Sequence, residues 1–175
     1  MSDLTRLVSA AAFAAHKHRD QRRKDANASP YINHPLELAR VLSVEGGVVD
    51  PTTLIAALLH DTIEDTDTTA AEVDSEFGTA VCGVVQEVTD DRTLPKAERK
   101  RLQVEHAASI SDRAKLVKLA DKICNLRDVA NSPPANWNLD RKREYFDWAR
   151  TVVDALRGVS PGLEQVFDRA YAARP

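Results

Sequence analysis

A run of acidic side chains follows an apolar segment near the middle of the chain. The apolar residues 54–59 end at His60, and the stretch from residue 61 to residue 76 then contains no lysine or arginine. Its carboxylates are Asp61, Glu64, Asp65, Asp67, Glu72, Asp74 and Glu76. Like charges at this density repel one another, and the negative end of a preceding helix adds to the repulsion. A bound cation would relieve it, so the pattern favours a metal site, with a solvated acidic cap beside a core histidine as the alternative.

Helical spacing groups the donors of this segment into two pairs. His60 and Glu64 are four residues apart, as are Asp61 and Asp65, so a continuous helix would place the pairs on adjoining strips of its surface. We therefore expect one strip to supply metal ligands. The last turn is expected to direct carboxylates at a water molecule.

Two further residues have the chemistry of metal ligands. His34 lies in residues 30–35 (PYINHP), where prolines restrict the backbone on both sides. Asp121 stands at the border between an apolar and a polar helix face in residues 118–123 (KLADKI). A carboxylate next to a core needs a partner, because burying an unpaired charge is very costly. Taken by itself, Asp121 favours a salt bridge to a lysine or Arg127 as that partner, with a metal ion as the alternative.

The elements that carry these residues are predicted to be helices. Apolar residues recur at helical spacing through most of the chain, and the low glycine and aromatic content suits an all-α fold. Capping signals predict helix starts at Asp50, Thr69, Pro95, Ser111, Asp140 and Ser160. Four valines at helical spacing predict a helix over residues 79–90, with a strand as the less favoured alternative. We expect one all-α domain over residues 1–175.

The overall charge argues against long polyanionic partners. The 175 residues have a formal net charge of −3. Basic side chains nevertheless gather in residues 16–25 and 92–101, which suits a compact phosphorylated molecule better than nucleic acid. There is no leader pattern and no apolar run of the roughly 18 residues that span a bilayer. We expect a cytoplasmic protein that binds neither nucleic acid nor membrane, with Cys82 and Cys124 as buried reduced thiols.

Taken together, His34, His60, Asp61 and Asp121 form the pattern His…His-Asp…Asp, which resembles the metal signature of HD domains. Four segments resemble the hydrolase domain of the RelA/SpoT family: residues 21–25 (QRRKD), 30–35 (PYINHP), 58–66 (LLHDTIEDT) and 118–128 (KLADKICNLRD). The resemblance runs from about Phe13 to Tyr145. It is closest to the stand-alone small alarmone hydrolases, a group that includes the metazoan SpoT homologues.

This resemblance implies an HD-domain helical bundle of roughly ten helices that holds one Mn²⁺ ion. It implies the metal ligands His34, His60, Asp61 and Asp121 and the catalytic carboxylates Glu64 and Asp65. It also implies substrate contacts from Arg23, Lys24, Lys96, Asn125, Arg141 and Tyr145. Two imidazoles and two carboxylates without a thiolate suit Mn²⁺, and Zn²⁺ or Fe²⁺ would accept the same donors.

By the same resemblance, the chain hydrolyses guanosine 3′,5′-bis(diphosphate), or its pentaphosphate form, at the 3′-pyrophosphate. A metal-activated water would release pyrophosphate and GDP or GTP. Two alternatives stay open: a phosphohydrolase acting on another nucleotide, such as the 2′-phosphate of NADPH, and an alarmone-binding module without catalysis. The loop of residues 24–30 lacks the glycine usual in this family, so we expect a different path towards the base. The sequence leaves the oligomeric state open.

Overall fold

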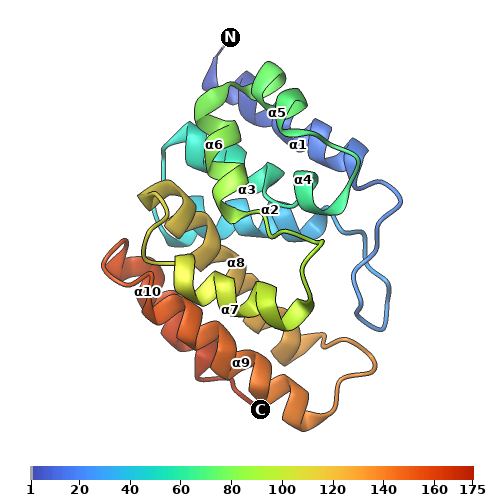
Figure 1. Ribbon diagram of the computed structural model, residues 1–175, viewed down its shortest axis with the longest axis vertical. Coiled ribbons are helices and arrows are strands. Elements are labelled where there is room, and N and C mark those ends of the chain that lie inside the picture. Colours follow the sequence, from blue (N-terminus) through green and yellow to red (C-terminus); the bar gives the residue numbers. More distant parts are fainter. Residues whose placement is uncertain (1) are drawn as a thin grey trace.

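The chain is built almost wholly from helices and the loops that join them. The computed structural model describes residues 2–175, and within them the only β pairing is an isolated bridge between Arg22 and Pro30. The α-helices are α1 (Asp3–Lys17), α2 (Asn33–Arg40), α3 (Pro51–Leu59), α4 (Thr62–Asp65), α5 (Ala70–Phe77), α6 (Thr79–Val88), α7 (Lys96–His106), α8 (Asp112–Asn131), α9 (Leu139–Asp154) and α10 (Pro161–Tyr171). A short π-helix, η1 (Val41–Glu45), continues α2. The predicted all-α bundle is confirmed (Figure 1).

At Asp50 and Thr69, side-chain caps begin helices where the sequence predicts them, whereas α9 is capped by Asn138 and not by Asp140, which lies in its first turn. Asp50 accepts a hydrogen bond from the backbone N–H of Thr53, and Pro51 follows as the first residue of α3. Thr69 likewise accepts from the backbone N–H of Glu72 at the start of α5. The predicted helix over residues 79–90 is also confirmed, since α6 occupies most of that range.

The segment around His60 is not the single helix that the spacing predicts. The helix α3 ends at Leu59, His60 and Asp61 form a turn, and α4 is a separate single turn that begins at Thr62. The Thr62 hydroxyl donates to the Leu59 carbonyl oxygen at 2.7 Å, while Asp61 has a ψ of 0°. A side chain that donates a hydrogen bond to a helical carbonyl oxygen competes with the backbone N–H groups that would otherwise bond to it. The site residues of this segment therefore lie at a bend in the chain and do not form adjoining strips on one helix.

The long helix α8 lies at the centre of the fold. It contacts α2, α3, α6, α9, α10 and η1. Half of its 20 residues are buried, and two of these are lysines, Lys118 and Lys122. A buried lysine needs compensating charge, so these positions mark where the core meets a charged site. Cys82 on α6 and Cys124 on α8 are both buried and unpaired, as predicted.

Two loops on the same side of the molecule frame the region where the site lies. In Figure 1, the loop between α1 and α2 and the loop between α8 and α9 both project from the side away from α10. The backbone N–H of Ala135 donates to the carbonyl oxygen of Lys24 at 3.3 Å, which joins the two loops. Segments more than a hundred residues apart in the sequence thus border one space.

The loop that lacks the usual glycine has a left-handed residue. Ala28 has a φ of +47°, the only positive φ of a non-glycine residue among residues 2–175. Asp25 closes the loop by accepting hydrogen bonds from the N–H and the hydroxyl of Ser29, at 2.9 and 2.6 Å. An alanine therefore adopts a conformation that favours glycine.

Candidate metal centre and active site

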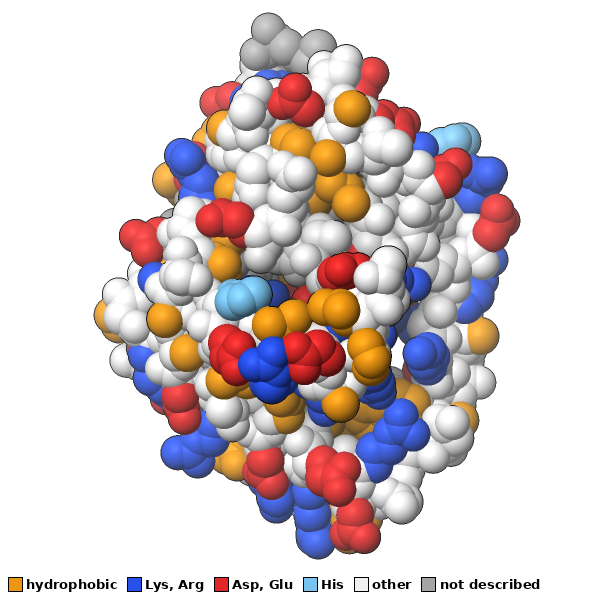
Figure 2. Space-filling model, in the orientation of Figure 1, with side chains coloured by type: hydrophobic (Ala, Val, Ile, Leu, Met, Phe, Trp, Pro, Cys, Tyr) orange, Lys and Arg blue, Asp and Glu red, His pale blue; other side chains and the backbone are white. Residues whose placement is uncertain are grey.

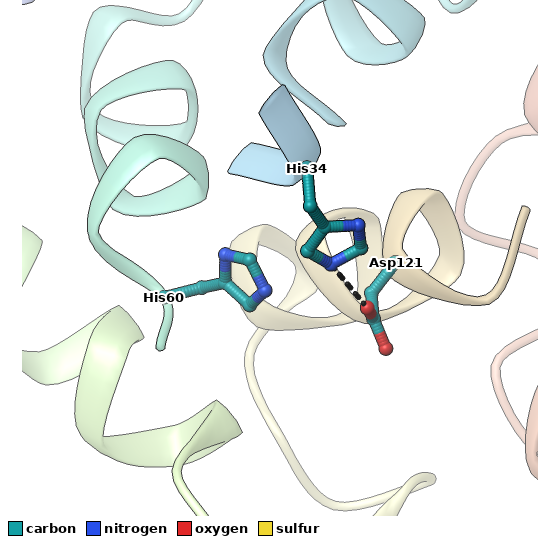
Figure 3. Close-up of side chains that lie close together, drawn as sticks. All are labelled: His34, His60 and Asp121. Atoms are coloured by element: carbon teal, nitrogen blue, oxygen red, sulfur yellow. Dashed lines mark hydrogen bonds and ion pairs between the residues drawn. The ribbon is translucent and has the colours of Figure 1, made fainter. Parts of the chain in front are cut away.

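Three side chains from separate helices meet at one point. His34 comes from the first turn of α2, His60 from the turn that follows α3 and Asp121 from the middle of α8 (Figure 3). One ligand atom of each residue lies within 4.8 Å of the others, and both histidines are buried. The Nε2 atom of His34 is 3.1 Å from Oδ1 of Asp121. Two imidazoles and a carboxylate at this separation make a candidate metal-binding group.

The imidazole of His60 is oriented by the backbone. Its Nδ1 lies 2.8 Å from the carbonyl oxygen of Ala57, so Nδ1–H donates and the opposite ring nitrogen faces the site. That nitrogen, Nε2, is buried, and its one close polar neighbour among the described residues is Oδ2 of Asp61, at 3.0 Å. Burial alone would lower the pKa of His60, but the neighbouring Asp61 carboxylate outweighs it and raises the pKa to about 9. The surroundings of Nε2 therefore favour a positive charge.

Asp61, the fourth predicted ligand, lies beside this group. Its Oδ2 is 3.0 Å from His60 Nε2 and also accepts a hydrogen bond from the Tyr31 hydroxyl. Burial would raise the pKa of Asp61, yet the His60 imidazole holds it below its usual range. Asp61 is thus an ionised carboxylate next to the three converging donors, and its role as a ligand stays a prediction.

Asp121 is fixed by its neighbours on α8. Lys122 donates to Oδ2 at 3.0 Å, and Asn125 donates to Oδ1 at 2.6 Å. Burial would raise the pKa of Asp121, but Lys122 holds it well below the usual range. The lysine salt bridge considered from the sequence is therefore present, whereas Arg127 pairs with Glu45 at 2.8 Å. Asp121 forms this salt bridge and also lies beside two histidines. The two interpretations from the sequence, a salt bridge and a metal ligand, are therefore compatible.

Two cavities meet at this group. The small one, of about 150 Å³, has the three donors on its wall together with Asp61, Glu64 and Lys118. The large one, of about 860 Å³, lies between the two loops. Both are lined by Arg23, Tyr31, His34 and Asn125. A cavity of several hundred Å³ is of the size that holds small-molecule ligands, so the large one can hold a nucleotide and the small one a phosphate-sized group.

The two predicted catalytic carboxylates face different cavities. Glu64 lines the small cavity, where the backbone N–H of Asp90 donates to its Oε2 at 2.9 Å. Burial raises the pKa of Glu64, which makes it a better proton acceptor than an ordinary carboxylate. Asp65 lines the large cavity, where it accepts a 2.8 Å hydrogen bond from Gln21 and pairs with Arg92. Their surroundings differ, so their roles can differ.

Four of the predicted substrate contacts line the large cavity: Arg23, Lys24, Asn125 and Tyr145. Arg23 pairs with Asp128 and lies over the Tyr31 ring, 5.6 Å from its centroid. Tyr145 packs between two indoles, those of Trp137 and Trp148, with centroid distances of 5.5 and 5.4 Å. This wall offers aromatic surface and a guanidinium plane to a ligand.

The other two predicted substrate contacts, Lys96 and Arg141, line neither cavity. Burial lowers the pKa of Lys96, and the positive charges of Arg141 and Lys24 lower it further. The three cations therefore lie near one another. Arg141 stacks over Trp137 at 4.8 Å from the ring centroid, and Trp137 lines the large cavity. Like charges gathered in this way repel one another unless an anion joins them, so the cluster suits phosphate groups next to the cavity.

The structure adds three site residues that the sequence did not single out. Tyr31 donates to Asp61, Gln21 donates to Asp65, and Lys118 lines the small cavity. Tyr31 and Gln21 lie in the same sequence segments as His34 and Arg23. No periodic pattern, however, links Tyr31 to Asp61 or Gln21 to Asp65, which are 30 and 44 positions further along the chain. Lys118 had a usable signal, because it precedes Asp121 by one helical turn.

The fold and the site together define the class of protein. The HD domain family profile matches residues 10–147, so the chain belongs to the HD-domain family. Relatives that match along almost their full length narrow the comparison. The chain is 56% identical to guanosine-3′,5′-bis(diphosphate) 3′-pyrophosphohydrolase MESH1 of Xenopus tropicalis, over 97% of this chain and 95% of that protein. It is 54% identical to the protein of the same name in Homo sapiens, over 99% and 97%.

Solved structures agree with this placement. A metazoan orthologue of SpoT that hydrolyses ppGpp and plays a role in starvation responses matches with a TM-score of 0.94 and 50% identity, over 97% of this chain and 95% of that one. A Listeria monocytogenes protein matches with a TM-score of 0.64 and 26% identity, over 79% and 96%. The expected resemblance to the small alarmone hydrolases and the expected HD-domain bundle are confirmed.

The surface shows a mixed distribution of charge. On the face in Figure 2, lysine and arginine side chains are interspersed with acidic ones and form no continuous band on that face. Separately, no helix within residues 2–175 is long and apolar enough to cross a membrane.

Proposed function

We propose that this chain hydrolyses guanosine 3′,5′-bis(diphosphate), or its pentaphosphate form, at the 3′-pyrophosphate, releasing pyrophosphate and GDP or GTP. The observation that carries the proposal is the junction of the two cavities. Metal-donor side chains and Glu64 line the small cavity, while cations and aromatic rings line the large one. A nucleoside in the large cavity would direct a ribose phosphate into the small one. The relatives that bear the name of this activity support the same substrate.

One Mn²⁺ ion is proposed in the small cavity, held by His34, His60, Asp61 and Asp121. The ion, when bound, supplies charge neutralisation on phosphoryl oxygens and lowers the pKa of water. The donors fit it, since the buried Nε2 of His60 faces the carboxylate of Asp61 and the other donors, and the set contains no thiolate. Hydrogen bonds from Tyr31 to Asp61 and from Asn125 to Asp121 orient the carboxylates.

Glu64 is assigned to removing the proton from the attacking water. It lines the small cavity, and its raised pKa suits a general base. The water oxygen forms a bond to the phosphorus attached to ribose O3′ while the O3′–P bond breaks. The water proton passes to Glu64 and from there to solvent, while O3′ takes up one proton from solvent as it leaves, so the protons balance. Asp65 is held by Gln21 and Arg92 at the wall of the large cavity, and we assign it to orienting the water.

The nucleotide is proposed to occupy the large cavity. Arg23 and Lys24 would contact the nucleotide, Asn125 the sugar, and Lys96, Arg141 and Tyr145 the phosphates and ribose. Arginine and lysine beside aromatic rings suit both phosphate and base recognition. We treat residues 1–175 as one domain in this scheme, since the HD match over residues 10–147 leaves only short flanks.

The test is turnover of ppGpp by the purified chain with product identification, with and without Mn²⁺, beside a parallel assay on NADPH. We expect pyrophosphate and GDP in equal amounts, and only when the metal is present. Inorganic phosphate from NADPH with no pyrophosphate from ppGpp would favour the other nucleotide. Tight binding of ppGpp without formation of product would favour the alarmone-binding module without catalysis. Full activity in a metal-free Asp61→Ala variant would overturn the assignment of the site.

A further inference from the structure

Lys118 is a buried cation in the small cavity without an acidic partner at contact distance. It lies on α8, one turn before Asp121, is 8% exposed and lines the cavity together with Glu64. Among residues 2–175 it forms no ion pair within 4.0 Å, whereas the neighbouring Lys122 pairs with Asp121 at 3.0 Å. The carboxylates of Asp90, Asp121 and Glu64 act on Lys118 only at longer range. Of the two buried lysines on this helix, one is therefore paired and the other is not.

An unpaired buried ammonium is unfavourable in the free protein. Burial, with a smaller contribution from Lys122, lowers the pKa of Lys118 to about 8, which still leaves most of the side chain charged at neutral pH. A charge kept in the interior without a partner costs free energy that an anion in the cavity would offset. A positive metal ion near Lys118 would add repulsion, and an anionic group between the two would remove it.

The order of the cavities fixes where such an anion would lie. The small cavity adjoins the large one at Arg23, Tyr31, His34 and Asn125. On its other side it adjoins a third cavity, of about 190 Å³, and the residues lining both are Asp90, Gln103 and Lys118. Lys118 does not line the large cavity. It therefore stands at the end of the small cavity that is remote from a nucleoside in the large one.

We infer that Lys118 contacts the distal phosphate of the 3′-diphosphate and so distinguishes a diphosphate from a monophosphate on the ribose. The inference rests on the proposed function, because it places the nucleoside in the large cavity. A single phosphate reaches the metal donors, but only a second phosphate extends past them to Lys118. The ammonium donates a charge-assisted hydrogen bond to a non-bridging oxygen, and no proton is transferred.

Kinetics on two ligands test this assignment. Lys118→Met keeps the length of the side chain and removes its charge, Lys118→Arg restores a cation, and Lys115→Met alters a lysine of the same helix that lies outside the cavities. We expect Lys118→Met to lower kcat/KM for ppGpp by about 10- to 100-fold, as for a lost hydrogen bond to a charged group. The inhibition constant of guanosine 5′-diphosphate 3′-monophosphate should change little, and Lys118→Arg should recover part of the loss. Equal weakening of both ligands would overturn the inference.

Direct binding of inorganic pyrophosphate separates this inference from the proposed function. Titration calorimetry in buffer with a constant excess of Mn²⁺ should show wild-type affinity in Lys115→Met and at least about tenfold weaker binding in Lys118→Met. That result would support the assignment of Lys118 even if ppGpp were not the substrate. Unchanged pyrophosphate binding in Lys118→Met would overturn it. Thermal unfolding and bound Mn²⁺ are measured for each variant, and Lys118→Gln replaces Lys118→Met if the latter does not fold.

Discussion

The side-chain amide of Gln21 donates a 2.8 Å hydrogen bond from Nε2 to Oδ2 of Asp65, across 44 positions of sequence. The amide has one orientation, because its Oε1 lies 2.6 Å from Nδ1 of His18, which donates to it. Asp65 pairs through its other oxygen with Arg92. The residues His18 and Gln21 thus hold a candidate catalytic carboxylate at the edge of the large cavity.

Gln21→Leu should lower kcat without a matching change in KM. The substitution removes the hydrogen bond that orients Asp65, and we expect kcat to fall by about tenfold, the effect of one hydrogen bond to a charged group. Steady-state kinetics on ppGpp check this, with the exposed Gln165→Leu as the matched control. A rise in KM alone would show that Gln21 contacts substrate and does not position Asp65.

Glu64→Gln should separate chemistry from metal binding. The amide keeps the shape of the side chain and can still accept the hydrogen bond from Asp90, but it cannot take a proton from water. We expect kcat to fall by about 10²- to 10⁴-fold, the range for loss of a general base, with the Mn²⁺ content unchanged. Single-turnover assays and metal analysis measure the two quantities, and Glu76→Gln on the exposed part of the acidic run is the control. Retained activity would assign the base to another residue.

His60→Ala should abolish metal binding while the fold persists. The substitution removes the ring nitrogen that faces the other donors, and the loss of affinity should exceed the about 10- to 100-fold typical of residues that only support a ligand. Mn²⁺ titration and circular dichroism measure affinity and fold. Treatment of the wild-type protein with a chelator should also stop turnover, and added Mn²⁺ should restore it. Wild-type metal affinity in His60→Ala would place the metal elsewhere.

Asp50→Ala should destabilise the protein in a pH-dependent way. Burial would raise the pKa of Asp50, but hydrogen bonds from Arg113 and Thr53 lower it to about 2 from its ordinary 3.8. At pH 7 we expect the free energy of unfolding to fall by about 1–2 kcal/mol, as for loss of a helix cap. Because the folded pKa is depressed, the charge stabilises the fold above pH 4 and this contribution is lost as the pH falls towards 2. Urea unfolding at several pH values tests this, and a difference that stays constant down to pH 2 would contradict it.

Ala28→Gly should stabilise the loop after α1. An alanine in the left-handed region costs about 1–2 kcal/mol. Glycine removes this cost, but the greater freedom of its unfolded chain offsets part of the gain, so we expect a net gain of about 0.5–1 kcal/mol. The matched control is Ala26→Gly, because Ala26 is in the same loop and has no positive φ. Thermal unfolding of the two variants should show changes of opposite sign. Equal loss of stability in both would show that the left-handed strain at Ala28 is negligible.

The sequence by itself determined the helices and the chemical identity of the donors. Caps such as Asp50 and Thr69 act within one turn, so their effect can be predicted from neighbouring residues alone. The histidines and carboxylates are recognised by residue type and local spacing, which tertiary contacts do not alter. For this reason the all-α fold could be expected from the residues themselves, whereas the grouping of His34, His60 and Asp121 is expected from the resemblance to the HD-domain pattern.

The tertiary structure alone decided how those donors are arranged. The turn at His60 replaces one continuous helix by two, and Asp61 lies beside the three converging donors, where it accepts a hydrogen bond from Tyr31. The support of Asp65 by Gln21 and the unpaired state of Lys118 likewise depend on which helices pack against α4 and α8. Such contacts join residues that are distant along the chain, and their distances are set by the packing of the whole core, for which local sequence has no signal.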